Sequence, residues 1–169
     1  MVARVLPTRE TVFAILDCVM DPEVPVLSVC ELGIVRDVAI DASGAVTVTV
    51  TPTYSGCPAI RVIEEDIASA LRSGGIDDVT IRTTYAPAWT SDWIPETARA
   101  KLKAYGIAPP GRAESGGALV QLMRARPAAQ CPYCESFETE VRSEFGSTAC
   151  KSVCWCRACL QPFEEFKAI

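Results

Sequence analysis

The feature that most restricts this sequence is a pair of C-x-x-C motifs near its C-terminal end. The motif "CPYC" occupies residues 131–134, and "CRAC" occupies residues 156–159. Each motif can form a tight turn that directs two thiolates at one ion, and a hairpin between them would bring both turns together in tetrahedral geometry. A segment this short cannot bury a self-sufficient core, so it needs a staple. We therefore predict a β-rich zinc ribbon over residues 129–169, with structural zinc held by Cys131, Cys134, Cys156 and Cys159.

Two further cysteines leave the ligand set open. Cys154 and Cys156 are two residues apart on a predicted strand, so their side chains point the same way and Cys154 competes as a ligand. Cys150 lies close by, and buried or redox-active thiols are the alternative to a zinc site. Glu135 also stands where a glycine often follows the second cysteine of such a turn.

The charge of the chain argues against nucleic acid and membrane partners. The formal net charge is -5, and residues 131–169 carry four basic and six acidic groups, to which a zinc tetrathiolate adds further negative charge. No segment approaches the roughly 20 apolar residues of a membrane span, and no signal peptide is recognised. We expect a cytoplasmic protein with reduced thiols.

The absence of histidine restricts the chemistry further. It removes the usual general base and the usual nitrogen ligand, which excludes Ser-His-Asp and Cys-His catalysis and the histidine-containing di-iron sites of oxygenases. We expect an accessory protein that is not itself catalytic. A thiol-dependent enzyme is a less favoured alternative.

The hydrophobic periodicity before residue 107 predicts an α+β fold, a small helix-on-sheet domain. Apolar residues recur at helical spacing or alternate along strands, and Gly or Pro residues end several of these runs. We predict a domain over residues 1–106, a Pro- and Gly-rich linker over 107–128 and then the ribbon. The expected elements are a helix from Thr8 to Met20, a hairpin of strands Ile34–Ile40 and Ala45–Thr51, a helix from Pro58 to Arg72, a strand Val79–Thr83 and a helix from Pro95 to Gly106.

A solitary cysteine stands at the predicted strand-to-helix turn in the stretch "TPTYSGCPAI". Pro58 fits the first helical position, which places Cys57 at the N-cap beside the positive end of the helix dipole. The thiolate form is then favoured, and a thiolate is both a nucleophile and a soft metal ligand. The alternative is a small buried cap without chemistry.

Several long stretches carry a family resemblance. The stretches "DPEVPVLSVCELGIVRDV", "PTYSGCPA" and "APAWTSDWIPETARAKLKAYGIAPP" resemble the PaaD family of phenylacetate-degradation proteins, a branch of the MIP18-like iron-sulfur cluster assembly family. The C-terminal "CPYC", "FGSTACK" and "PFEEFK" are similar to its zinc-ribbon extension. This resemblance implies a role in maturing the multicomponent 1,2-phenylacetyl-CoA epoxidase, by helping an iron-sulfur cluster reach the reductase component. It places the cysteine of the family on Cys57, and its acidic DPE motif on Asp21 and Glu23.

A cluster on this chain is expected to be transient. Clusters usually take four thiolates, whereas the first domain offers Cys18, Cys30 and Cys57. Cys57 would share the cluster with a second copy in a homodimer, with an iron-sulfur carrier or scaffold protein, or with the client.

Neighbouring side chains are assigned supporting roles. Thr53 and Ser55 are candidates for hydrogen bonds to cluster sulfur, and Asp21 and Glu23 for polarising or coordinating the site. Trp89 and Trp93 are either core anchors or contacts for a client protein. In the alternative function, the protein is a structural adaptor of the epoxidase complex and Cys57 only caps a helix.

Overall fold

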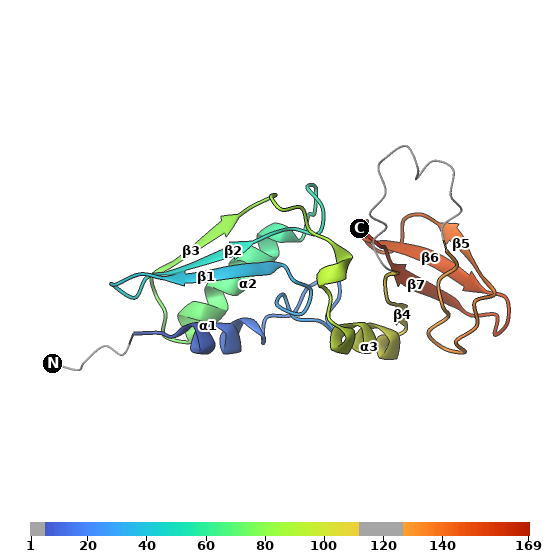
Figure 1. Cartoon of the computed structure of the whole chain (residues 1–169), viewed down its shortest axis with the longest axis horizontal. Coiled ribbons are helices and arrows are strands. Elements are labelled where there is room, and N and C mark those ends of the chain that lie inside the picture. The colour runs from blue at the N-terminus through green and yellow to red at the C-terminus, as the bar shows by residue number, and fades with distance from the viewer. Residues whose placement is uncertain (1–5, 112–126) are drawn as a thin grey trace. The chain divides into compact units, whose positions relative to one another are not determined.

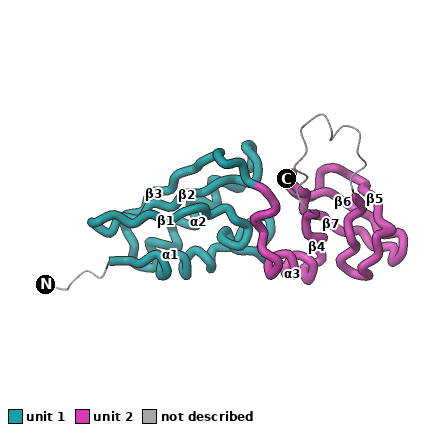
Figure 2. The backbone as a smooth tube through the Cα atoms, in the orientation of Figure 1, with its two compact units in different colours: residues 1–89 teal, residues 90–169 magenta. Residues whose placement is uncertain are grey.

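The computed structural model describes residues 6–111 and 127–169, which fall into two compact units (Figure 2). The first unit ends at Trp89 and the second begins at Thr90. This division differs from the predicted domain boundary at Gly106, because the helix before that glycine groups with the second unit. Most of the predicted linker lies outside the described residues.

The first unit packs two helices on a three-stranded sheet (Figure 1). Strands β1 and β2 form an antiparallel hairpin, and β3 pairs with β2 in parallel, so the strand order is β1-β2-β3. Helix α2 makes the connection between the parallel strands. The elements are α1 (Arg9–Leu16), β1 (Val35–Ile40), β2 (Val46–Val50), α2 (Ile60–Ser73) and β3 (Val79–Thr83). The predicted α+β class and element order are confirmed.

The hydrophobic periodicities become the core of this unit. The three valines of β2 alternate with half-buried threonines and are almost fully buried. On α2, Ile63, Ile67 and Leu71 recur every four residues, and each is at most 1% exposed. Trp89 closes the unit, since it is buried and its indole Nε1 donates a hydrogen bond to the Leu32 carbonyl over 2.9 Å. Trp89 is therefore a core anchor.

Helix α1 is shorter than the sequence predicts. It ends at Leu16, with Asp17 as its C-cap, and does not reach Met20. Met20 instead forms an isolated antiparallel bridge with Ser28. The amide of Val29 donates to the Val19 carbonyl over 2.9 Å, so the chain reverses across residues 20–28.

The second unit is a four-stranded sheet preceded by a short 3-10 helix and an α-helix (Figure 1). Strands β5, β6 and β7 form an antiparallel meander, and β4 adds to β7 in parallel, giving the order β4-β7-β6-β5. The elements are η1 (Ser91–Trp93), α3 (Glu96–Tyr105), β4 (Ile107–Ala108), β5 (Thr139–Ser143), β6 (Lys151–Cys156) and β7 (Pro162–Phe166). The predicted β-rich C-terminal segment is confirmed, and β4 comes from the beginning of the predicted linker.

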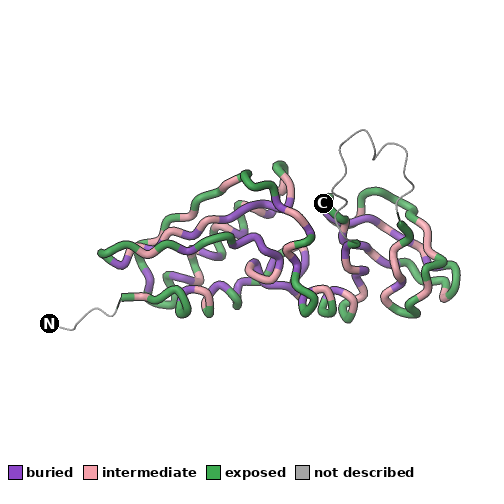
Figure 3. The backbone as a smooth tube through the Cα atoms, in the orientation of Figure 1, coloured by how far each residue is buried: buried purple, intermediate pink, exposed green. Residues whose placement is uncertain are grey.

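The buried interior of the second unit is small and rich in sulfur (Figure 3). One buried cluster consists of Ala108, Cys131, Cys154, Cys156 and Phe163. Such an interior supplies little apolar area, which agrees with the expectation that this part of the chain depends on a staple. Across the described residues, no helix is long and apolar enough to cross a membrane.

Candidate functional site

Four cysteine sulfurs converge in the second unit. The Sγ atoms of Cys131, Cys134, Cys156 and Cys159 all lie within 4.8 Å of one another. The Cys131 and Cys159 sulfurs are 3.7 Å apart, and those of Cys134 and Cys156 are 3.5 Å apart. Four sulfurs at about 2.3 Å from a tetrahedral zinc ion would be separated by about 3.8 Å. The donor set and its spacing therefore fit a tetrathiolate metal centre.

The two C-x-x-C turns have matching backbone geometry. The amide of Glu135 donates to the Cys131 carbonyl over 3.0 Å, and the amide of Leu160 donates to the Cys156 carbonyl over 3.0 Å. Glu135 has φ 63° and Leu160 has φ 60°, so both adopt the left-handed conformation that glycine adopts most easily. The glycine missing after Cys134 therefore changes the residue but leaves the turn intact.

The thiols of the cluster differ in acidity. Backbone amides, that of Cys159 first, donate to the Cys156 sulfur and lower the pKa of this thiol to about 7. Loss of hydration raises the pKa of Cys159 to about 12. A bound divalent cation favours the thiolate form of its ligands, so metal binding releases the remaining protons.

The two competing cysteines lie outside this group. Cys154 is buried, and its sulfur is 3.6 Å from Oε2 of Glu165, to which it donates. Cys150 is also buried, and its sulfur lies 3.1 Å from the Thr148 hydroxyl. Among the described residues, the four sulfurs that come together are those of the two C-x-x-C pairs.

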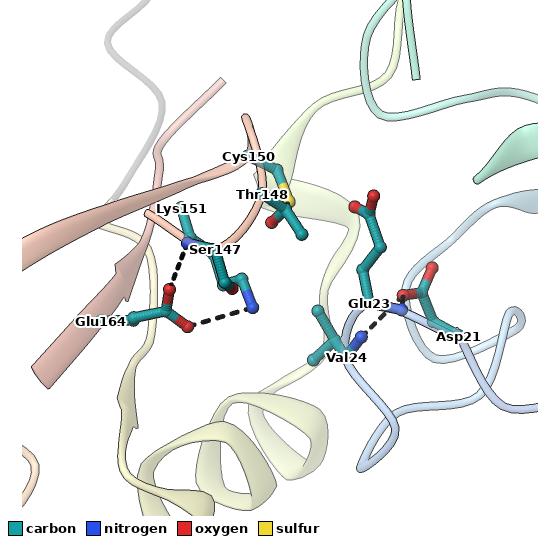
Figure 4. Close-up of polar contacts among 8 residues, drawn as sticks. All are labelled: Asp21, Glu23, Val24, Ser147, Thr148, Cys150, Lys151 and Glu164. Carbon is teal, nitrogen blue, oxygen red and sulfur yellow. Dashed lines mark hydrogen bonds and ion pairs between the residues drawn. The ribbon is translucent and has the colours of Figure 1, made fainter. Parts of the chain in front are cut away.

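The "FGSTACK" stretch forms a tightly held turn between β5 and β6 (Figure 4). Oε1 of Glu164 accepts a hydrogen bond from the Ser147 amide over 2.6 Å, and Oε2 of Glu164 lies 3.1 Å from the Lys151 ammonium. A Cβ on Gly146 would lie 2.7 Å from Oε1 of Glu164, so this contact requires glycine. The stretch thus has a structural role within the unit, which sequence reasoning did not identify.

Cys57 lies in the loop between β2 and α2 of the first unit. Its predicted position at the helix N-cap is wrong. Helix α2 begins at Ile60 with Ala59 as its N-cap, while the Cys57 carbonyl accepts a hydrogen bond from the Ile60 amide over 3.4 Å. The amide of Cys57 donates to the Tyr54 carbonyl over 3.2 Å, so the thiol projects from a short turn that precedes the helix.

The prediction of a favoured thiolate at Cys57 is also wrong. Half-burial of the side chain raises the pKa of the Cys57 thiol, and the charges of Glu23 and Asp21 act in the same direction. Amide hydrogen bonds from Ala59 and Ile60 lower the pKa but offset only part of the increase. In the resting protein Cys57 is a neutral, partly accessible thiol.

Asp21 and Glu23 have different environments (Figure 4). Asp21 is 6% exposed, and its Oδ1 accepts hydrogen bonds from the amides of Glu23 and Val24, each over 2.8 Å. The Asp21 amide donates to the Leu27 carbonyl over 2.9 Å, so this residue organises the turn of the "DPEVP" stretch. Glu23 is half-buried, and its charge contributes to the field at Cys57.

The hydroxyls near Cys57 are not equivalent. Thr53 is buried, whereas Ser55 is exposed. Thr51, which the sequence reasoning passed over, is 1% exposed, and its hydroxyl has no hydrogen-bond partner among the described residues. Its place at the end of the alternating β2 pattern gave no signal of this.

The other two cysteines of the first unit are poor partners for Cys57. Cys18 is exposed, and its thiol donates to the Ala14 carbonyl over 3.5 Å. Burial raises the pKa of Cys30 to about 12, with Asp17 adding to the increase. Neither joins a described group of three or more metal-ligating side chains.

Comparison with protein families defines the class of this protein. Residues 9–83 match the family described as iron-sulfur cluster assembly protein, and residues 116–167 match the PaaD zinc beta ribbon domain. The chain thus joins an iron-sulfur assembly domain to a zinc ribbon.

A full-length relative identifies the particular family. The chain is 40% identical over 163 residues to a 1,2-phenylacetyl-CoA epoxidase subunit of Escherichia coli K12, covering 96% of this chain and 94% of that protein. The chain belongs to the PaaD family.

Shorter relatives cover the first part of the chain. It is 40% identical over 98 residues to an Fe-S protein maturation auxiliary factor of Porphyromonas gingivalis, covering 57% of this chain and 92% of the relative. A solved domain of unknown function from Bacillus anthracis has a TM-score of 0.52 and 26% identity, over 55% of this chain and 89% of that structure. A conserved hypothetical protein of Thermotoga maritima has a TM-score of 0.50 and 33% identity, over 57% and 95%. These likenesses agree with the assembly-type fold of the first unit.

Proposed function

We propose that this protein delivers an iron-sulfur cluster to the multicomponent 1,2-phenylacetyl-CoA epoxidase, with the reductase component as the client. The full-length similarity to an epoxidase subunit supports the client system, and the similarity of the first unit to maturation factors supports the cargo. The observation on which the mechanism depends is Cys57, a partly accessible thiol that projects from the turn before α2.

Cys57 would bind the cluster by ligand exchange. A bond from the Cys57 sulfur to cluster iron forms as a donor thiolate leaves, and the Cys57 proton passes to the departing sulfur. Neither the iron nor the sulfur changes oxidation state in this exchange. Because the thiol is neutral at rest, the chain would not retain metal at Cys57 between transfers, which suits a carrier better than a store.

The carboxylates of the DPE motif would act through the position and charge of this loop. Asp21 holds the turn through the Glu23 and Val24 amides, while Glu23 contributes negative charge at Cys57. Thr53 and Ser55 are proposed as hydrogen-bond donors to the cargo. A second copy, a carrier or scaffold protein, or the client would complete the ligand set, since Cys18 and Cys30 do not.

The four-cysteine centre is proposed to hold a structural zinc ion. Cys131, Cys134, Cys156 and Cys159 have the spacing for a tetrahedral ion, and the ribbon has little apolar core of its own. The ion would brace the second unit, which would contact epoxidase components. We expect one zinc per chain and little tightly held iron.

The deciding experiment measures the iron content of the client reductase after reconstitution with the protein. The Cys57→Ser variant should leave the reductase deficient in cluster while still binding it, and Cys18→Ser is the control because it removes an exposed thiol of the same unit. Full cluster occupancy with Cys57→Ser would exclude transfer through this residue and leave the structural adaptor as the function.

A further inference from the structure

The last turn of α3 is connected to the first turn of the four-cysteine centre. The Lys103 ammonium lies 2.5 Å from Oε1 of Glu135. Glu135 directly follows the ligand Cys134 and adopts the left-handed conformation that completes the turn. An ion pair thus links a helix of the second unit to a residue adjacent to a metal ligand.

A second contact lies at the end of the same helix. Gly106 is the C-cap of α3, with φ 90°, and a Cβ at this position would lie 2.9 Å from the Tyr133 hydroxyl oxygen. Tyr133 stands between the ligands Cys131 and Cys134. The helix end and the metal turn are therefore in close contact, and the glycine leaves the space for the tyrosine.

The strand that follows α3 enters the same buried cluster as two of the ligands. Strand β4 pairs with β7 through Ile107↔Glu164 and Ala108↔Glu165. The Ala108 side chain is buried with Cys131 and Cys156. Contacts with the metal centre therefore come from the end of α3, from Gly106 and from β4.

The composition of this cluster makes the ion important for the helix. Two of the five buried residues in the cluster are ligands, and four neutral thiols pressed within 4.8 Å gain nothing comparable to four metal bonds. A sheet with so little apolar interior does not close without a staple. Loss of the ion would therefore release whatever rests on the ligand turns.

We propose that α3 and β4 belong to the metal-dependent folding unit, and that Lys103 is a positioning residue of the metal centre. This inference depends on the proposed metal occupancy of the four cysteines. It extends the metal-stapled body to residues 96–108, ahead of the zinc-ribbon family match that begins at residue 116. Metal occupancy then determines whether α3 is held in place.

Hydrogen exchange of the full-length protein tests the coupling. The zinc-loaded chain is compared with the same chain after chelation and after zinc is restored. Amides of α3 should lose protection by about tenfold or more on chelation and recover with zinc, because local opening becomes accessible. Amides of α2 serve as the internal reference, since they lie in the other unit and should not respond. Unchanged α3 protection in the metal-free chain would overturn the proposal.

Substitution of Lys103 tests its positioning role. Lys103→Met should accelerate chelator-driven zinc loss by about two- to fivefold, as expected for an ion pair at a partly exposed position. Lys101→Met is the matched control, because Lys101 is an exposed lysine of the same helix and Glu135 pairs with Lys103. Equal rates of zinc loss for the two variants would remove Lys103 from the metal centre.

Metal analysis separates this inference from the proposed function. A purified chain without zinc, in which zinc addition changes no α3 amide, would overturn both the zinc assignment and the coupling. One zinc per chain with metal-independent α3 protection would overturn the coupling alone. Cluster delivery by Cys57 is measured on the client, so its failure would leave this inference intact.

Discussion

Glu135 and Leu160 occupy equivalent positions in the two turns of the four-cysteine centre. Each follows the second cysteine of its C-x-x-C motif, and each donates its amide to the carbonyl of the first cysteine over 3.0 Å. Their φ values, 63° and 60°, differ by only a few degrees. The metal turn is therefore defined by backbone conformation, and side chains larger than hydrogen bear a steric cost there.

Leu160→Gly should stabilise the metal centre. Leu160 is 63% exposed, so little burial is lost, while glycine avoids a left-handed penalty of about 1 kcal/mol. The chelator concentration needed to remove half of the zinc should therefore rise. Leu160→Ala is the control, because it removes most of the side chain but keeps the Cβ, and a higher chelator midpoint for alanine than for glycine would contradict the explanation.

Substitution of the six C-terminal cysteines should separate ligands from core thiols. Cys134→Ser should lower the zinc content well below one per chain, because a thiolate ligand is lost. Cys150→Ala and Cys154→Ala should keep one zinc per chain, since their sulfurs face Thr148 and Glu165. Metal analysis of the purified variants checks this, and zinc loss in Cys154→Ala would restore Cys154 as a ligand.

The reactivity of Cys57 should increase only at alkaline pH. Its raised pKa keeps the thiol protonated above the ordinary cysteine value of about 8.5. The folded state therefore holds this proton more tightly than the unfolded state. The resulting contribution to stability is present below the unfolded pKa and is lost as the pH rises through the folded pKa. Alkylation of the Cys57 peptide, followed by mass spectrometry against pH, should show a midpoint above that of an unfolded cysteine.

Glu23→Gln should move this alkylation midpoint to lower pH. The substitution removes a negative charge that opposes ionisation of Cys57 and keeps a side chain of similar size. Glu10→Gln, an exposed position on α1, is the control and should leave the midpoint in place. An unchanged midpoint in Glu23→Gln would exclude a direct charge effect.

Trp89→Phe should destabilise the first unit by about 1–3 kcal/mol. The substitution keeps most of the buried ring but leaves the Leu32 carbonyl without its indole donor. Urea unfolding, followed by exchange of the α2 amides, measures the loss. Trp93 lies in the other unit and is half-buried, so Trp93→Phe should leave these amides unchanged.

Much of the fold follows from periodicity in the sequence. The alternating "VTVTV" predicts β2 and its buried valines, and the four-residue spacing of Ile63, Ile67 and Leu71 predicts α2. Helix ends were less predictable, because local turns compete with helical continuation. Pro58 fits a first helical position, yet the turn that begins at Cys57 delays α2 until Ile60.

The candidate site was predictable where chemistry depends on motif spacing. The C-x-x-C pairs were sufficient to select the four converging sulfurs from six C-terminal cysteines. The protonation of Cys57 was not predictable, because it depends on burial and on charges more than 30 residues away in the sequence, at Asp21 and Glu23. Strand β4 was missed because two residues beside a Pro-rich stretch carry no periodic signal.

The parallel pairing of β4 with β7 has a consequence for synthesis on the ribosome. Ile107 must wait for Glu164, which is translated 57 positions later (164 minus 107). At about 5–20 residues per second, that interval is roughly 3 to 11 seconds. The first unit has all its strands much earlier, so the nascent chain carries a finished N-terminal body while the sulfur-rich half is still unable to close.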